Sequence, residues 1–264
     1  MFADAYRIAS RFTLPVVISS RSDRGVCAST IGACVVVNRD GWILTCAHLL
    51  QEIERQRKSV AKHDAHRDGV RRLERDTVAD KRFRKTKVRG ITRPAAGSVR
   101  NHSVWWGRDG AQLHDIAMMP AADLALGRLQ PFDPASVAHY PKFKRPGANY
   151  APGRSLCKLG FPFHAITPSF DQDNNAFVLP PGAVPLPLFP IEGLFTRVVV
   201  AAMPGMEADQ KGKFIETSSP GLVGQSGGPI VDADGAVWAL QSHTRHYPLG
   251  FSPPAPGEEA RAKK

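Results

Sequence analysis

The segment GLVGQSGGPIV, residues 221–231, places four glycines and a proline around a single serine, Ser226. A chain uses glycine where φ is positive or where another backbone approaches closely. The pattern therefore predicts a tight turn that presents the Ser226 hydroxyl and then enters an apolar strand at Pro229. Glycine-rich turns are also common in plain hairpins, so a functional interpretation needs partners elsewhere in the chain.

Two other segments carry side chains that could act on a serine hydroxyl. TCAH, residues 45–48, ends a predicted strand, and DLAL, residues 123–126, begins another. Together with GQSGGP, residues 224–229, these motifs resemble those of the trypsin-like (chymotrypsin-fold) serine peptidases, in the family order His, Asp, Ser. Two further segments, residues 38–45 and 157–162, resemble the HtrA (Deg) branch of bacterial peptidases. The C-terminal remainder is short, so we expect no PDZ domain after this unit.

The resemblance implies a serine endopeptidase that works through an acyl-enzyme intermediate. It makes Ser226 the nucleophile, His48 the general base and acid, and Asp123 the residue that orients the imidazole. The backbone N–H groups of Gly224 and Ser226, helped by Gln225, would form the oxyanion hole. The substrate would be a protein or peptide, and no cofactor is needed.

Gln225 is a departure from the digestive members of the family. They carry an aspartate immediately before the serine, where it receives the new N-terminus after cleavage. A glutamine cannot form that ion pair, so we expect no activation by N-terminal cleavage.

The orienting carboxylate has two candidates in the sequence. Asp115, in the segment HDIAM, also resembles the aspartate motif, but its strand soon meets Pro120. Asp123 leads the longer apolar segment DLALGRL, which is more typical of a strand. The pattern favours Asp123 and leaves Asp115 open as the alternative.

In the resemblance, counting back from Ser226 places the floor of a primary specificity pocket at residues 219–221, with residues 241–243 as one wall. The floor and wall contain no acidic side chain, so we expect a small or apolar P1 residue rather than Lys or Arg. The predicted substrate-binding residues are Ser219, Pro220, Gly221, Gln241, Ser242 and His243.

No metal site is expected. The pairs His63/His66 and His243/His246 have HxxH spacing, but neither has further ligands at convincing spacing. The four cysteines show no CxxC pair, which favours buried free thiols.

The net charge of +11 is concentrated in one segment, since residues 51–100 contain 16 Lys and Arg against 7 Asp and Glu. We interpret residues 51–103 as a basic, partly helical insertion. Its only aromatic residue before position 93 is Phe83, which argues against stacking on single-stranded nucleic acid. A solvated insertion, or a regulatory protein partner bound through residues 51–93, is favoured over nucleic acid. The corresponding alternative functions are a partner-gated regulatory module and a nucleic-acid-associated factor.

Many short, evenly spaced strand patterns predict an all-β fold. The resemblance implies two six-stranded antiparallel β-barrels, which form one peptidase domain over residues 1–246. Residues 247–264 are interpreted as a Pro-rich, charged tail. No apolar run is long enough to span a membrane and no signal peptide is evident, so we expect no membrane association and a cytoplasmic location.

Overall fold

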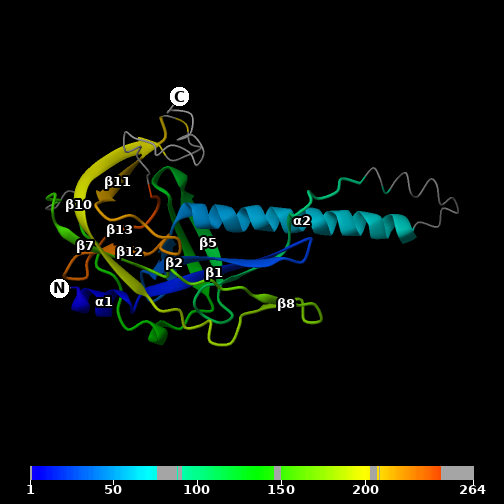
Figure 1. Ribbon diagram of the computed structural model, residues 1–264, viewed down its shortest axis with the longest axis horizontal. Coiled ribbons are helices and arrows are strands. Elements are labelled where there is room, and N and C mark those ends of the chain that lie inside the picture. Colours follow the sequence, from blue (N-terminus) through cyan, green and yellow to red (C-terminus); the bar gives the residue numbers. More distant parts are fainter. Residues whose placement is uncertain are drawn as a thin grey trace, which may run out of the picture.

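The computed structural model describes residues 2–75, 88, 91–145, 150–202, 207 and 209–244. Two curled antiparallel sheets dominate this part of the chain (Figure 1). The all-β prediction is therefore confirmed. The predicted tail, residues 247–264, lies outside the described residues.

The first sheet has six strands, as predicted, hydrogen-bonded in the order β4-β1-β2-β3-β6-β5. The strands are β1 (Thr13–Ser22), β2 (Cys27–Val36), β3 (Trp42–Thr45), β4 (Val99–Trp105), β5 (Gln112–Met119) and β6 (Leu124–Gln130). A hairpin joins β2 and β3, and its turn contains Gly41 with φ +82°. The Asn38 side chain accepts the Trp42 N–H at 3.2 Å. Apolar side chains of β1, β2 and β3 form much of the main core.

The second sheet has five strands in the described part of the chain, in the order β11-β10-β7-β12-β13. They are β7 (Ser155–Gly160), β10 (Phe189–Ala202), β11 (Lys211–Thr217), β12 (Pro229–Val231) and β13 (Val237–Leu240). A separate hairpin of β8 (Ser169–Asp171) and β9 (Ala176–Val178) was not predicted. Its three-residue strands are too short for an alternating pattern to be recognised.

Among the elements that the structure describes, three short helices lie outside the sheets. They are α1 (Ala3–Ala9) and the 3₁₀ turns η1 (Pro120–Ala122) and η2 (Pro134–Ser136).

The long helix α2 (Ala47–Arg75) is the main element outside the sheets, and it projects away from them (Figure 1). Its first turns bury Leu49, Leu50 and Ile53 in the main core, whereas the later turns are mostly exposed. The helix is therefore anchored to the first sheet at the end that carries His48.

The predicted insertion, residues 51–103, meets ordered elements at both ends. Helix α2 runs through its first half, and β4 at its end pairs with β1 in the first sheet. Ser59 Oγ donates to the Val99 carbonyl at 2.8 Å, which joins the two. Among the described helices, none combines the length and apolar character that crossing a membrane requires.

Candidate active site

The first sheet brings His48 and Asp123 to the same edge. Strand β3 ends at Thr45 and α2 begins two residues later, so His48 lies in the first turn of the helix. Asp123 follows η1 in the left-handed region (φ 49°, ψ 40°) and directly precedes β6. Because Thr45 pairs with Ala125 across β3 and β6, the two turns lie next to each other.

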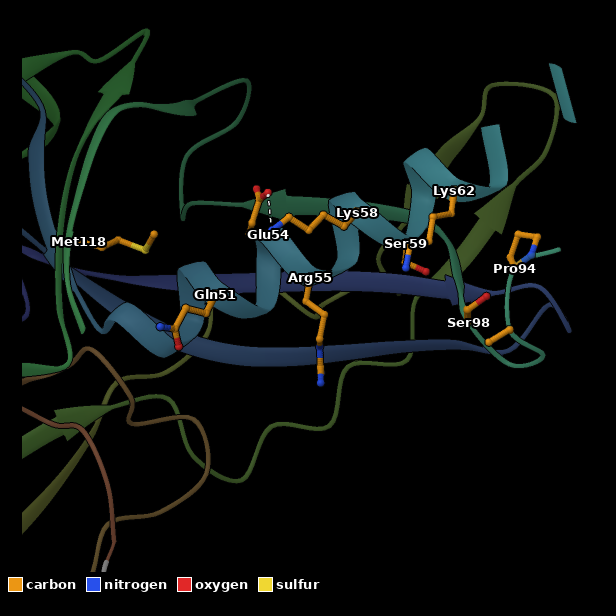
Figure 2. Close-up of a pocket in the computed structure, with 10 residues that line it drawn as sticks. Gln51, Glu54, Arg55, Lys58, Ser59, Lys62, Pro94, Ser98 and Met118 are labelled. Atoms are coloured by element: carbon orange, nitrogen blue, oxygen red, sulfur yellow. Dashed lines mark ion pairs between the residues drawn. The ribbon is translucent and has the colours of Figure 1, made fainter. Parts of the chain in front are cut away.

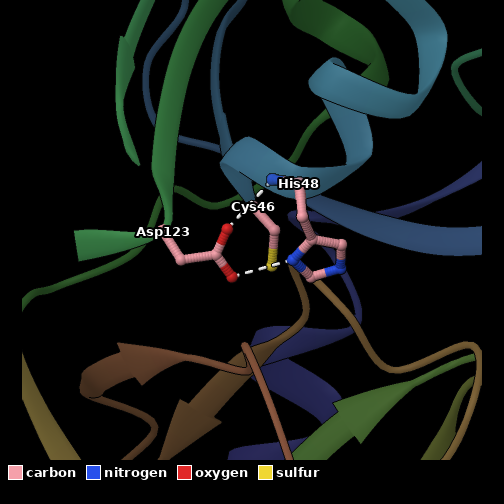
Figure 3. A group of neighbouring side chains, drawn as sticks. All are labelled: Cys46, His48 and Asp123. Carbon is pink, nitrogen blue, oxygen red and sulfur yellow. Dashed lines mark hydrogen bonds and ion pairs between the residues drawn. The ribbon is translucent and has the colours of Figure 1, made fainter. Parts of the chain in front are cut away.

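Asp123 contacts His48 through both carboxylate oxygens. Oδ1 accepts the His48 backbone N–H at 2.9 Å, and Oδ2 lies 2.8 Å from His48 Nδ1. Figure 3 shows the Nδ1 side of the ring directed at Asp123 and the other ring nitrogen directed away. The contact fixes the imidazole with Nδ1 on the carboxylate and leaves Nε2 for other chemistry.

Asp123 is almost fully buried, with 3% of its surface exposed. Burial by itself would raise its pKa, but hydrogen bonds from His48 and Ser242 and the charge of His48 lower the pKa below its usual value. The Ser242 hydroxyl donates to Oδ2 at 2.5 Å. Asp123 is therefore held as a carboxylate.

Asp115, the alternative acid, has a different environment. It is exposed and has φ 51° in β5. Neither of the hydrogen bonds that His48 makes among the described residues involves Asp115. Of the two aspartates, only Asp123 makes a hydrogen bond to His48 in the described part of the chain.

The glycine-rich turn holds Ser226 against both sheets. Gly224 and Gly227 have φ of +97° and +83°. A Cβ at Gly224 would lie 2.4 Å from the Phe161 carbonyl oxygen, and one at Gly227 would lie 2.1 Å from the Ala33 carbonyl oxygen. The Ala33 N–H donates to the Ser226 carbonyl at 2.7 Å. Both the backbone conformation and the close approach therefore require glycine.

The same supports connect this turn to the His48 turn. The Gln241 carbonyl accepts the Gly227 N–H at 2.9 Å and the Cys46 thiol at 2.8 Å. Cys46 is two residues before His48, so one acceptor fixes the two turns together. Within the described part of the chain, neither Ser226 Oγ nor His48 Nε2 makes a hydrogen bond, which leaves both available to a substrate.

The backbone around Ser226 corrects one predicted role. The Gln225 N–H donates to the Leu222 carbonyl at 3.1 Å, and its side chain is only 1% exposed. Gln225 Oε1 accepts the Leu222 N–H at 2.9 Å. Gln225 therefore stabilises the turn from inside and is not an oxyanion donor. The N–H groups of Gly224 and Ser226 make no hydrogen bond to any described residue.

The predicted wall of the substrate site divides into two environments. Ser242 lies on Asp123, and the His243 ring packs edge-on against His48 with centroids 5.1 Å apart. Gln241 instead points inward, since Nε2 donates to the Leu159 carbonyl at 2.8 Å and the residue is 6% exposed. The Gln241 side chain is therefore structural, which corrects its predicted substrate-binding role.

The predicted floor, residues 219–221, has two partners that sequence reasoning missed. The Gly221 N–H donates to Thr244 Oγ1 at 3.1 Å, which joins the floor to the wall. Lys158 Nζ donates to the Ser219 and Pro220 carbonyls at 2.6 and 2.7 Å. Lys158 is the one charged residue in the apolar strand SLCKLG, and that exception was the available signal.

Cys46, His48 and Asp123 also form the group of possible metal ligands found among the described residues, with ligand atoms within 4.8 Å of one another. Burial and the Asp123 charge raise the pKa of the Cys46 thiol well above its usual value. A neutral thiol that already donates to Gln241 is a poor metal ligand. Cys46 is one of four free cysteines, of which Cys34 and Cys157 are also buried.

A hollow of about 600 Å³ lies beside α2 (Figure 2). None of the predicted catalytic or substrate-binding residues lines it. Its lining residues are Gln51, Glu54, Arg55, Lys58, Ser59, Lys62, Pro94, Ala95, Ser98 and Met118.

Residues 32–240 match the family described as trypsin-like peptidase domain. A solved structure of the HtrA-type protease AlgW with tripeptide shares 16% identity, with a TM-score of 0.46, and the match covers 91% of this chain and 53% of AlgW. The active form of the Rv3671c protease from M. tuberculosis shares 15% identity, with a TM-score of 0.45, and the match covers 89% of this chain and 71% of that one. The chain thus spans about half the length of the AlgW chain. No curated protein sequence matches it.

Proposed function

Because the chain belongs to the trypsin-like peptidase family, we propose that it is a serine endopeptidase that forms an acyl-enzyme on Ser226. The observation that carries this proposal is the contact of buried Asp123 with His48 Nδ1 at 2.8 Å. That contact leaves Nε2 as the basic nitrogen, which is the one a serine hydroxyl needs. The Gln241 carbonyl also supports the proposal, because it accepts hydrogen bonds from Gly227 and Cys46 and so links the Ser226 turn to the His48 turn.

In the proposed acylation, Ser226 Oγ attacks the scissile carbonyl carbon while His48 Nε2 takes the hydroxyl proton. The imidazolium so formed is stabilised by the Asp123 carboxylate. His48 then gives the proton to the leaving amine as the C–N bond breaks. Water, deprotonated by His48, hydrolyses the ester and restores Ser226.

The negative charge that develops on the carbonyl oxygen needs donors. The N–H groups of Gly224 and Ser226 are suited to this role, because neither donates to another described group. Gly224 has a positive φ, which orients its backbone differently from that of a residue in an ordinary turn. Loss of one such donor typically lowers the rate by about 10²–10³-fold.

The alternatives predicted for the basic segment stay predictions. Ion pairs form along α2: Lys58 Nζ lies 3.6 Å from Glu54 Oε1, and Arg67 Nη2 lies 2.8 Å from Asp64 Oδ1. Such pairs are typical of a solvated helix with alternating charges. This pairing supports a solvated surface or a protein contact more than a nucleic-acid-binding arm.

Labelling with a fluorophosphonate probe tests the proposed function. The wild-type protein should form a covalent adduct that is lost in Ser226→Ala and strongly reduced in His48→Ala. Ser136→Ala, on the η2 turn, is the matched control and should label as the wild type does. Labelling that persists in Ser226→Ala would contradict the proposed nucleophile.

A further inference from the structure

Lys158 carries a buried ammonium group that the proposed catalytic steps do not use. The residue is 3% exposed and lies on β7, in the interior of the second sheet. Its Nζ donates to the carbonyls of Ser219 and Pro220. An ammonium has three N–H donors, so these two carbonyls leave one donor over.

A buried ammonium is normally paired with a carboxylate, because an unpaired charge is costly to remove from water. No ion pair to Lys158 exists among the described residues. Its neighbours across the sheet are Ile191 on β10 and Ile230 on β12. Residues 219–221 likewise contribute no ionisable side chain. Within the described residues, the protein therefore holds a cation at this point without a carboxylate paired to it.

The position of the Lys158 ammonium group suggests a role in substrate recognition. Ser219 and Pro220 are the residues expected to form the floor of the primary specificity pocket. We propose that Lys158 selects substrates with an acidic P1 side chain, Asp or Glu, whose carboxylate accepts the remaining N–H. The proposal rests on the proposed peptidase function, and it replaces the small or apolar P1 residue expected from the sequence.

The predicted floor of the pocket is in direct contact with Thr244, which follows the predicted wall. The Gly221 N–H donates to Thr244 Oγ1 at 3.1 Å, and Thr244 Oγ1 donates to the Gly221 carbonyl at 3.2 Å. An entering P1 side chain separates these two groups to reach Nζ. The charge on Lys158 supplies an attraction for this step that a neutral side chain of equal size would lack.

The cost of burying the ammonium is already incurred in the folded protein, so the site is preorganised for an anion. A hydrogen bond to a charged group is worth more than a neutral one. Glu and Gln differ at P1 only in charge and hydrogen-bonding type. We expect kcat/KM for Glu to exceed that for Gln by at least about tenfold.

The experiment uses N-acetylated tetrapeptide coumarin amides that differ only at P1: Glu, Gln, Asp, Asn, Ala, Leu and Lys. The wild type should prefer the acidic member of each isosteric pair. Lys158→Gln, which can still donate to a carbonyl, should bring the Glu/Gln ratio close to one. Lys213→Gln, at an exposed lysine on the same sheet, is the matched control and should keep the wild-type ratio.

A measurement on the unmodified protein guards against a variant that fails to fold. Burial lowers the pKa of Lys158 to about 8. The ammonium therefore loses its proton as the pH rises through this value, and the Glu/Gln ratio of kcat/KM should fall between pH 7 and 9. His48 acts on both substrates alike, so its titration cancels in the ratio. A ratio that stays constant with pH would overturn the proposal.

Binding to Ser226→Ala separates the two proposals. Tighter binding of the Glu peptide than of the Gln peptide, lost when Lys158→Gln is added, supports the acidic site even if no peptide is cleaved. Cleavage that depends on Ser226 but shows equal rates for Glu and Gln retains the peptidase function and overturns the role of Lys158. Equal binding of the two peptides likewise overturns it.

Discussion

Asp123 contacts His48 through both carboxylate oxygens: Oδ1 accepts the His48 backbone N–H at 2.9 Å, and Oδ2 lies 2.8 Å from His48 Nδ1. The first contact places a carboxylate at the N-terminus of α2, where an anion is favoured by the unpaired N–H groups and the helix dipole. The second orients the ring. One side chain therefore fixes both the start of the helix and the tautomer of the histidine that the helix carries.

Replacing this carboxylate should separate orientation from folding. Asp123→Asn keeps the size of the side chain but can present an amide to Nδ1, which favours the wrong tautomer. We expect kcat to fall by about 10⁴-fold, the typical effect in such triads. The check is steady-state cleavage of the best coumarin peptide, together with circular dichroism to establish folding.

The rival acid provides the control. Asp115→Asn alters an exposed aspartate of the same unusual backbone region, with φ of 51° against 49° for Asp123. Its kcat should stay within about twofold of wild type, since surface changes have small effects. A larger loss of kcat in Asp115→Asn than in Asp123→Asn would contradict the assignment of Asp123 as the residue that orients His48.

The Ser242 hydroxyl should govern the behaviour of Asp123 in acid. Its hydrogen bond helps keep the Asp123 pKa below the usual value. A carboxyl group whose pKa is lower in the folded state contributes stability above its unfolded pKa, and this is lost as the pH falls through the folded value. Ser242→Ala raises the folded pKa, so acid unfolding should begin at a higher pH.

Acid titration followed by circular dichroism between pH 6 and 2 measures this effect. At neutral pH the variant should also lose about 1 kcal/mol of unfolding free energy, the typical value of one hydrogen bond. Ser136→Ala, whose hydroxyl donates to the Asp133 carbonyl and not to Asp123, should unfold at the wild-type pH. An unchanged midpoint in Ser242→Ala would show that the hydroxyl does not influence the carboxylate.

The glycines of the Ser226 turn can be tested for close approach separately from backbone conformation. Gly227→Ala places a Cβ 2.1 Å from the Ala33 carbonyl oxygen, in addition to the strain of φ +83°. Gly153 has a similar φ of +87° but no atom within 4 Å of the added Cβ. Gly153→Ala should therefore cost only the conformational strain, about 1–2 kcal/mol.

Gly227→Ala should cost clearly more than Gly153→Ala and should also abolish fluorophosphonate labelling, because Ser226 shifts with the turn. Urea unfolding measures the first effect and probe labelling the second. Equal destabilisation of the two variants would mean that the turn accommodates a side chain, against the packing described above.

The outer part of α2 should be dispensable for peptide cleavage. His63 Nε2 lies 2.9 Å from Ser98 Oγ, so residues 64–97 can be replaced by a short Gly-Ser link between two positions that already touch. We expect kcat/KM for small peptides within about threefold of wild type, because the core residues of α2 lie before this point.

A larger deletion is the contrasting variant. Removing residues 51–93 also removes Ile53 and Gln56, each 5% exposed, and should prevent folding. Thermal unfolding and peptide cleavage of both variants provide the readouts. A folded but inactive 64–97 deletion would instead give the outer helix a part in catalysis.

Much of the fold, and the segments that carry the candidate site, could be predicted from local pattern. Positive φ demands glycine, so the turn around Ser226 was visible in the sequence before its strands were placed. The strands at the three motifs could be predicted from apolar segments and turn residues. The short β8–β9 hairpin had too few residues to show such a pattern.

The predicted roles of Gln225 and Gln241 failed because local pattern does not show where a side chain points. Gln225 was expected to face an oxyanion, yet its N–H closes a turn onto Leu222. Gln241 was expected to line the substrate site, yet its amide reaches the Leu159 carbonyl. Spacing from Ser226 locates these residues along the chain, but the direction of each side chain depends on the packing of the sheets.

The sequence by itself determined the strand pattern, the glycine turn and the three motifs in their order, because each depends on residues close together in the chain. Only the tertiary structure decided which aspartate meets His48, that Ser242 supports that aspartate, and that Lys158 lies beneath residues 219 and 220. These contacts join residues about 60 to 120 positions apart. Strand register and sheet packing create them, and neither can be read from one segment alone.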